Sequence, residues 1–201
     1  MSRKPRIAVF ASGSGSNFEA IAEAVQSGEL GADIPVLITD KPLAPVITRA
    51  ERLGIPAAAV NPKAFPDKAA FERTVLARLR DEEIDWIVLA GYMRLIGPTL
   101  LGAFPNRIVN IHPSLLPAFP GKDAVGQALA AGVETTGVTV HFVDEGMDTG
   151  PVILQREVPV VPGDREATEA AIHAVEHDLY KEALQKLLAE ELTRDRAESR
   201  N

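Results

Sequence analysis

Cysteine is absent from the 201 residues of this chain. Disulfide bonds and thiolate nucleophiles are therefore excluded, and the composition does not indicate whether the protein works in an oxidising or a reducing compartment. No apolar run approaches the roughly 20 residues that a membrane-spanning helix needs. The basic first residues lead into a short apolar stretch and not into a signal-peptide cleavage site, so we expect a cytoplasmic protein without a membrane segment.

An excess of positive charge is also missing. The chain has 21 Lys and Arg residues against 28 Asp and Glu residues, which gives a formal net charge of −7. A surface that coats nucleic acid needs clustered Lys and Arg, so we expect no nucleic-acid partner, although a local phosphate site stays open. Hydrophobic residues make up 46% of the chain, enough to bury the core of one domain.

Two signatures of nucleotide binding are incomplete. The glycine loop at Gly13 and Gly15 lacks the third glycine of the dinucleotide fingerprint, and no Walker sequence occurs in the chain. The loop still suits one phosphate, because Ser16 or Asn17 can cap a helix that starts near Phe18 and leave backbone N–H groups at its positive end. The alternative is a simple strand-to-helix turn.

Short apolar runs alternate with segments of helical pattern over the first half of the chain. This rhythm predicts right-handed crossovers and a single-domain α/β fold, a Rossmann-like open twisted sheet that is mostly parallel with helices on both faces. After about residue 137 two strands follow without room for a crossover helix, which predicts an antiparallel addition at the sheet edge. The predicted strands are residues 7–11, 34–39, 57–60, 86–90, 107–111, 138–143 and 151–158.

The C-terminal part of the chain predicts one long helix. Apolar residues recur at helical spacing over residues 165–192. Residues 1–192 are accordingly expected to form the folded domain. Residues 193–201 are polar, and we expect them to form a disordered tail.

Asn110, His112 and Asp148 form the most informative set of polar residues. Asn110 and His112 lie two residues apart on a predicted strand, so their side chains should share one face. Pro113 and Pro117 stop that strand and stiffen the turn after it, at the sheet edge where α/β proteins bind ligands. An amide, an imidazole and a carboxylate together suit proton transfer around a carbonyl. The alternative is a turn with an ordinary hydrogen-bonded histidine.

A possible metal motif lies in the last predicted helix, where His173, Glu176 and His177 match the inverted zinc-protease pattern H-x-x-E-H. Two histidines at i and i+4 could share a metal on one helical face. A catalytic zinc needs a third protein ligand, and none stands out, so we predict no metal. The alternative for these residues is a solvated helix face.

The chain resembles the folate-dependent formyltransferases, and among them those that act on phosphoribosylglycinamide (GAR) in purine biosynthesis. The resemblance covers residues 6–188 and rests on four segments in the family's order, residues 12–17, 89–94, 110–117 and 137–150. It implies an enzyme that transfers the formyl group of 10-formyltetrahydrofolate to the amine of GAR through a tetrahedral intermediate. It also implies small-molecule substrates only, and a monomer or homodimer.

Two alternatives follow from this resemblance. The formyltetrahydrofolate hydrolase and the methionyl-tRNA formyltransferase share the Asn, His and Asp set, but each is expected to carry an extra domain that 201 residues do not accommodate. A non-catalytic nucleotide-binding module would need the glycine loop and not the three polar residues. Their joint presence therefore favours an enzyme.

The resemblance also implies a role for individual residues. Asn110 would donate to the oxyanion, while His112 and Asp148 would handle protons. Asp123 and His173 stand where the family pattern varies, so no role transfers to them. The implied GAR-binding residues are Gly15, Ser16, Asn17 and Glu176, and the implied folate-binding residues are Lys68, Met93, Arg94, Leu95, Ile96, Asn110, Val143, Asp144, Glu145, Gly146 and Met147.

Overall fold

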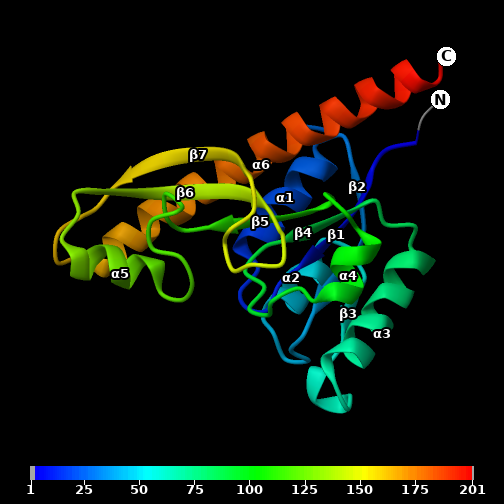
Figure 1. The fold of residues 1–201 in the computed structure, drawn as a ribbon, viewed down its shortest axis with the longest axis horizontal. Helices are drawn as coiled ribbons and strands as arrows, with labels where there is room; N and C mark the ends of the chain where they lie inside the picture. The colour runs from blue at the N-terminus through cyan, green and yellow to red at the C-terminus, as the bar shows by residue number, and fades with distance from the viewer. Residues whose placement is uncertain (1–2, 201) are drawn as a thin grey trace.

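A single seven-stranded sheet organises residues 3–200, the part of the chain that the computed structural model describes. Its strand order is β3-β2-β1-β4-β5-β6-β7 (Figure 1). The strands agree with the predicted ones to within a few residues at each end. They are β1 (Arg6–Phe10), β2 (Asp33–Thr39), β3 (Ala57–Ala59), β4 (Trp86–Leu89), β5 (Ile108–His112), β6 (Thr135–Phe142) and β7 (Val152–Pro159).

The predicted mixture of strand directions is confirmed. Strands β1 to β5 pair in parallel, whereas β6 runs antiparallel to β5 and β7 antiparallel to β6. The connections between strands carry helices α1 (Ser16–Gln26), α2 (Val46–Arg52), α3 (Lys68–Asp81), α4 (Pro98–Ala103) and α5 (Ala124–Ala131), with a 3-10 turn at η1 (Pro62–Ala64), and α6 (Arg165–Glu198) follows β7.

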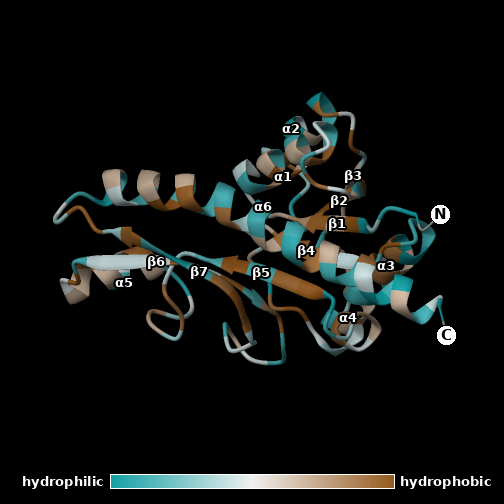
Figure 2. Ribbon diagram, turned by 90° about the horizontal axis from the view of Figure 1, so that it is seen from above, coloured by the Kyte–Doolittle hydropathy of each residue, from teal (hydrophilic) through white to brown (hydrophobic). Residues whose placement is uncertain are grey.

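The sheet separates two apolar clusters. One cluster joins alternate strand residues to α1, α2 and α6, with Phe18, Ile172 and Leu184 fully buried or nearly so. The other joins the remaining strand residues to α3 and α4, around Phe10 and Val75. Figure 2 shows these two groups of helices on opposite sides of the strands. The alternation arises because successive side chains of a strand point to opposite faces.

The strand order reverses between β1 and β4, since β2 follows β1 on one side and β4 lies on the other. Ligands of open α/β sheets bind at such a switch point, beyond the carboxyl ends of the two strands. The residues that follow β1 and β4 are the glycine loop and the segment from Gly91 onward. The topology therefore places both segments at the same crevice.

Helix α6 is longer than predicted. It continues to Glu198, so residues 193–198, which we expected to be part of a disordered tail, form its last turns. Glu191 holds this end against the sheet, because its carboxylate accepts a hydrogen bond from Trp86 Nε1 at 2.6 Å and pairs with Arg107. Asn201 lies outside the described residues.

None of the helices in residues 3–200 combines the length and the apolar character that crossing a bilayer requires.

Candidate functional site

The site is built on the polar face of β5 and its antiparallel neighbour β6. Asn110 pairs with His141 and His112 pairs with Thr139 in the register of the two strands. Directly opposed residues of an antiparallel pair point to the same face, as do residues i and i+2 of one strand. Asn110, His112 and His141 therefore share one face, as predicted for the first two, while Val109 and Ile111 point into the core on the other.

Asp148 lies between two imidazoles. Its Oδ2 atom is 3.5 Å from Nδ1 of His112, and its Oδ1 atom is 3.7 Å from Nε2 of His141. The backbone N–H of Gly121 donates a hydrogen bond to the same carboxylate at 2.8 Å. All three side chains are largely shielded from solvent, with exposed fractions of 8%, 3% and 11% for His112, His141 and Asp148. The structure thus brings together the imidazole and the carboxylate that were predicted from the sequence.

Each histidine has its second ring nitrogen against a backbone carbonyl. His112 Nε2 is 2.9 Å from the carbonyl oxygen of Phe119, and His141 Nδ1 is 2.8 Å from that of Phe142. A carbonyl only accepts hydrogen bonds, so these two nitrogens carry the protons. The nitrogens that face Asp148 then carry the lone pairs of the two rings. Two imidazoles and one carboxylate make up a proton-handling group.

Asp148 reaches this position from an unusual backbone conformation. Its φ angle is 56°, in the left-handed region that residues other than glycine rarely adopt. The loop that carries it, residues 143–150, is closed at its base by a hydrogen bond from Phe142 N–H to the Pro151 carbonyl. A side chain at Gly150 would collide with the Phe142 carbonyl. This close approach of the two ends turns the loop back over the polar face of β5.

Sequence reasoning missed three members of the site. His141 was not singled out, although it lies on a predicted strand, because the register against β5 was needed to place it opposite Asn110. The Phe119 carbonyl and the Gly121 N–H are backbone groups, so no side-chain pattern could reveal them. A glycine after Pro120 was the only available signal for that turn.

The glycine loop differs from the prediction in its cap. Helix α1 begins at Ser16, and its N-cap is Gly15 in the left-handed region, with φ 79° and no side-chain hydrogen bond. The prediction that Ser16 or Asn17 caps a helix starting near Phe18 is therefore wrong. The physical reason is that Gly15 alone can adopt this angle without strain, and a side chain there would also collide with Val46. The first N–H groups of α1 remain available to an anion.

Asn17 and Glu176 connect the start of α1 to α6. Asn17 Nδ2 donates a hydrogen bond to Glu176 Oε2 at 3.0 Å, and both side chains are buried. His173 Nδ1 lies 3.2 Å from the same oxygen, and this hydrogen bond raises the pKa of His173 above its usual value. Asn17 Oδ1 is buried without a partner among the described residues. An unpaired buried acceptor is costly, so it marks a place for a donor from a ligand.

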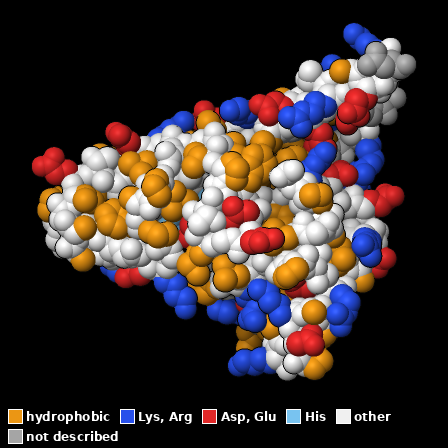
Figure 3. All heavy atoms as spheres, in the orientation of Figure 1, with side chains coloured by type: hydrophobic (Ala, Val, Ile, Leu, Met, Phe, Trp, Pro, Cys, Tyr) orange, Lys and Arg blue, Asp and Glu red, His pale blue; other side chains and the backbone are white. Residues whose placement is uncertain are grey.

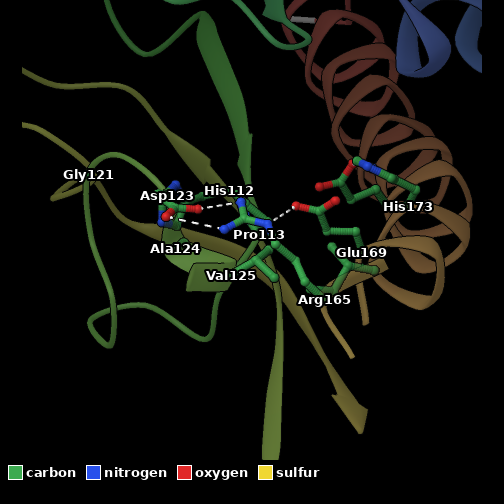
Figure 4. Close-up of a pocket in the computed structure, with 11 residues that line it drawn as sticks. His112, Pro113, Gly121, Asp123, Ala124, Val125, Arg165, Glu169 and His173 are labelled. Carbon is green, nitrogen blue, oxygen red and sulfur yellow. Dashed lines mark hydrogen bonds and ion pairs between the residues drawn. The ribbon is translucent and has the colours of Figure 1, made fainter. Parts of the chain in front are cut away.

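A cavity of about 260 Å³ extends from His112 to the first turns of α6. Figure 4 shows Arg165 between the carboxylates of Asp123 and Glu169 on its wall, with His173 on the neighbouring turn of the helix. Arg165 donates to Asp123 at 2.6 Å and to Glu169 at 2.8 Å. Glu176 also lines the cavity. His112, one of the catalytic candidates, and Glu176, an implied GAR-binding residue, thus open into one space.

A second cavity, of about 500 Å³, touches both segments predicted to hold a folate and extends along α4. Ile96 and residues after it line one side, and Glu145 of the 143–150 loop lines the other. Met93 and Leu95 are exposed, at 74% and 55%, as are Met147 at 49% and Arg94. Ile96 is 8% exposed and packs mainly into the apolar core. Of the predicted folate-binding residues, Ile96 and Glu145 line this cavity.

The remaining folate candidates lie around this cavity. Val143 packs against the core at the start of the 143–150 loop. Asp144 accepts hydrogen bonds from the Thr149 hydroxyl and from the Gly146 N–H, which lower the pKa of its carboxyl. Lys68 is exposed at the first turn of α3, beside Gly97. These contacts shape the loop and leave Lys68 open to a ligand.

Ser12 links the glycine loop to the segment that follows β4. Its N–H donates to the Gly91 carbonyl at 3.0 Å, and its hydroxyl accepts from the Met93 N–H at 2.9 Å. The same hydroxyl donates to the buried carboxylate of Asp40 at 2.6 Å. One small side chain thus fixes both segments at the crevice.

The metal motif does not assemble into a site in the structure. No group of three or more His, Asp or Glu side chains in residues 3–200 is arranged to hold a metal. His173 is engaged by Glu176, and His177 Nε2 is buried with no hydrogen-bond partner in that part of the chain. The absence of a metal stays a prediction.

The face in Figure 3 shows acidic, basic and apolar side chains interspersed, and Lys and Arg do not merge into one stripe there.

Comparisons with known proteins agree with this geometry. The formyl transferase family model matches residues 5–184. A phosphoribosylglycinamide formyltransferase of Bacillus subtilis is 53% identical over 91% of this chain and 94% of its own length. The crystal structures of a glycinamide ribonucleotide transformylase from Geobacillus kaustophilus and a phosphoribosylglycinamide formyltransferase from Bacillus halodurans are 62% and 55% identical, with TM-scores of 0.90 and 0.88.

These two structures cover 92% and 91% of the chain, and the chain covers 100% and 95% of them. The resemblance inferred from the sequence is confirmed. The chain belongs to the formyl transferase family.

Proposed function

We propose that this chain transfers the formyl group of 10-formyltetrahydrofolate to the amine of GAR, giving formyl-GAR in purine biosynthesis. The observation that carries the proposal is the approach of His112 to Asp148, with His112 on the wall of the cavity that α6 borders and Asp148 on the 143–150 loop, whose Glu145 lines the second cavity. The similar proteins named as GAR formyltransferases over nearly their full length support it.

The chemistry requires three tasks of the protein. The amine attacks the formyl carbon, and the tetrahedral intermediate carries an oxyanion and a positively charged nitrogen. The nitrogen must lose a proton, and the folate nitrogen must gain one before the C–N bond to folate breaks. No covalent enzyme intermediate is needed, which is consistent with a chain that has no cysteine.

Asn110 suits the first task. Its half-buried amide projects from the polar face of β5, at a register position fixed by pairing on both sides of the strand. An amide N–H preorganised in this way stabilises a developing oxyanion, and removing such a donor from other enzymes costs about 3 kcal/mol. We assign Asn110 this role.

His112 and Asp148 suit the proton transfers. The Phe119 carbonyl keeps the proton of His112 on Nε2, so Nδ1 is the nitrogen that exchanges a proton on the side of Asp148. The negative carboxylate stabilises the protonated ring and can order a water that relays the proton from the attacking amine. His141 lies against the other carboxylate oxygen and shares this charge.

The GAR site follows from the first cavity and the glycine loop. The phosphate would accept hydrogen bonds from the N–H groups of Gly15, Ser16 and Asn17 at the start of α1. The carboxylate of Glu176, held by Asn17, would accept from the ribose hydroxyls. Since Asn17 Oδ1 lacks a partner, it offers a further acceptor to the substrate.

The folate site follows from the second cavity. The pterin would lie between Ile96 and the loop that carries Glu145, which both line the cavity, with Met93, Arg94 and Leu95 on the chain just before Ile96. Lys68 would approach the glutamate tail as a point charge. Ile96 would contribute the apolar floor, because it is largely buried.

One assay tests the proposal. Product formation is measured from GAR with and without 10-formyltetrahydrofolate, and formate release is measured from the folate alone. We expect formyl-GAR only when both substrates are present. Formate release that does not depend on GAR would favour a hydrolase, and binding without turnover would favour a nucleotide-binding module.

We further propose that residues 1–192 suffice for activity, which the assay of a truncated protein would test. We also propose that the protein is a monomer or homodimer, which sedimentation would test.

A further inference from the structure

The turn before α5, which we call the 118–123 loop, supplies two backbone groups to the proton-handling residues. The Phe119 carbonyl accepts from His112 Nε2 at 2.9 Å. The Gly121 N–H donates to Asp148 Oδ2 at 2.8 Å. The two groups are only two residues apart, so the position of this loop sets the orientation of His112 and Asp148 together.

The loop adopts an unfavourable backbone conformation at both of its ends. Phe119 has a φ angle of 52° and Asp123 one of 54°, both in the left-handed region. Gly121, between them, has φ 78°. Non-glycine residues remain in this region only where surrounding contacts hold them there. Contacts from neighbouring residues must therefore hold the 118–123 loop in this conformation.

Gln127 provides the central contact. Its side-chain Nε2 donates to the Pro120 carbonyl at 3.0 Å and to the Lys122 carbonyl at 2.8 Å. A side-chain amide has two donor hydrogens, so both bonds can form at once. The Pro120 carbonyl belongs to the same peptide unit as the Gly121 N–H and is one peptide unit away from the Phe119 carbonyl, so Gln127 holds the backbone directly beside both groups that touch the site. Gln127 itself is half-buried and lies in the first turns of α5.

Other contacts hold the ends of the loop and not its centre. The Ser114 hydroxyl donates to the Ala118 carbonyl at 2.5 Å. Asp123 accepts from the N–H of Gly126 and from Arg165, in an exposed ion pair. An exposed pair contributes little because solvent screens it. Gln127 is thus the side chain that bears most directly on the placement of Phe119 and Gly121.

We infer that Gln127 is a positioning residue for the formyl-transfer site: its amide fixes the 118–123 loop so that the loop holds the His112 proton on Nε2 and directs Asp148 toward Nδ1. This inference rests on the roles proposed above for His112 and Asp148. Gln127 touches neither residue and acts only through the backbone of the loop. Small displacements of positioned groups have large kinetic effects, up to about a hundredfold for roughly 1 Å.

The test replaces Gln127 with Met, which keeps the length and helix preference of the side chain and removes both donors. Gln185→Met is the matched control, because Gln185 Nε2 donates to a backbone carbonyl, that of Glu29, at 3.1 Å on the exposed side of α6. We expect kcat of the Gln127 variant to fall by about tenfold to a hundredfold. The KM of each substrate should change by less than about threefold, and the control should keep its kcat.

Nitrogen-15 NMR of the imidazole rings tests the same inference without turnover. The chain has four histidines, so each ring can be assigned. Wild-type His112 should show a protonated Nε2, and Gln127→Met should show a mixture of tautomers at His112 and an unchanged His141, whose Nδ1 is held by Phe142. The NMR result does not depend on GAR being the substrate. Failure of the proposed function can therefore be distinguished from failure of the positioning role inferred for Gln127.

Three results would overturn the inference. One is an unchanged His112 signal in Gln127→Met. Another is an equal loss of kcat in Gln185→Met, which would reveal a general effect of lost stability. The third is a loss confined to the KM of GAR, which would show that the loop only shapes the cavity wall.

Discussion

Asp148 faces His112 across 3.5 Å from a left-handed backbone conformation, φ 56°. A strained angle at this residue is consistent with a functional constraint, since folding alone would favour a relaxed loop. The Gly121 N–H accounts for one lone pair of the carboxylate and leaves the rest for the imidazoles and water. The pair is therefore the first target for mutation.

Asp148→Asn should keep the shape of the side chain and remove its charge. We expect kcat to fall by about two orders of magnitude or more, the usual range for a positioned acid–base group, while folate binding changes little. Asp178→Asn serves as a control, because Asp178 is an α6 carboxylate with a 75% exposed side chain. Near-normal turnover in Asp148→Asn, measured at saturating concentrations of both substrates, would refute the assigned role.

The double mutant of His112→Asn and Asp148→Asn tests whether the two residues act as one unit. Each single mutant should be severely impaired. The combined loss in kcat should be smaller than the product of the single losses, because removing one member already disables the other. Steady-state kinetics on the four proteins provides the cycle. Fully multiplicative losses would mean that the residues act independently.

Gly15→Ala should impair both folding and GAR binding. The added Cβ would collide with Val46, and φ 79° is strained for alanine, so the melting temperature should fall. The KM of GAR should rise more than that of the folate, since the backbone N–H groups at this turn are displaced. Gly13→Ala is the control, because space around Gly13 is open and its φ is not in the left-handed region. Equal effects on both substrates would argue against phosphate binding here.

His173 should make the stability pH-dependent. Its hydrogen bond to Glu176 raises the pKa of His173, so the native state binds the proton more tightly than the unfolded chain. The resulting stabilisation is complete below about pH 6.5, the ordinary histidine pKa, and is lost as the pH rises through the raised native pKa. Urea unfolding from pH 5.5 to 8.5 should show a smaller decline in His173→Gln than in wild type. Parallel curves would contradict this.

Activity should not depend on a metal ion. His173 is engaged by Glu176, and residues 3–200 contain no cluster of three potential ligands. Exhaustive chelation is therefore expected to leave turnover intact, and elemental analysis should find less than one equivalent of zinc. Stoichiometric zinc whose removal abolishes turnover would require a different interpretation of α6.

Much of the fold could be predicted because its signals are local. Apolar runs located the strands, and the missing crossover after residue 137 located the antiparallel pair. Asn110 and His112 share a face because alternation along a strand is fixed by covalent geometry. The length of α6 was underestimated, because composition made residues 193–198 resemble a tail although Glu191 anchors the preceding turn to the sheet.

The rest of the site depends on geometry that is set by distant contacts. His141 enters through the β5–β6 register, and Asp148 through a loop whose ends meet at Gly150. Gly15 replaces Ser16 as the cap because of a left-handed angle and the closeness of Val46. Pattern and propensity describe single segments, so they do not contain this information.

Ser12 has a consequence for the energetics of substrate binding. Ser12 hydrogen-bonds to Gly91 and Met93, in the segment proposed to bind the folate, and it also begins the glycine loop, which is proposed to bind GAR. One residue therefore contacts the binding segments of both substrates. Ordering one segment lowers the entropy that remains to be lost when the other is ordered. GAR and the formyl donor should then strengthen each other's binding, and linkage requires the factor to be the same whichever substrate arrives first.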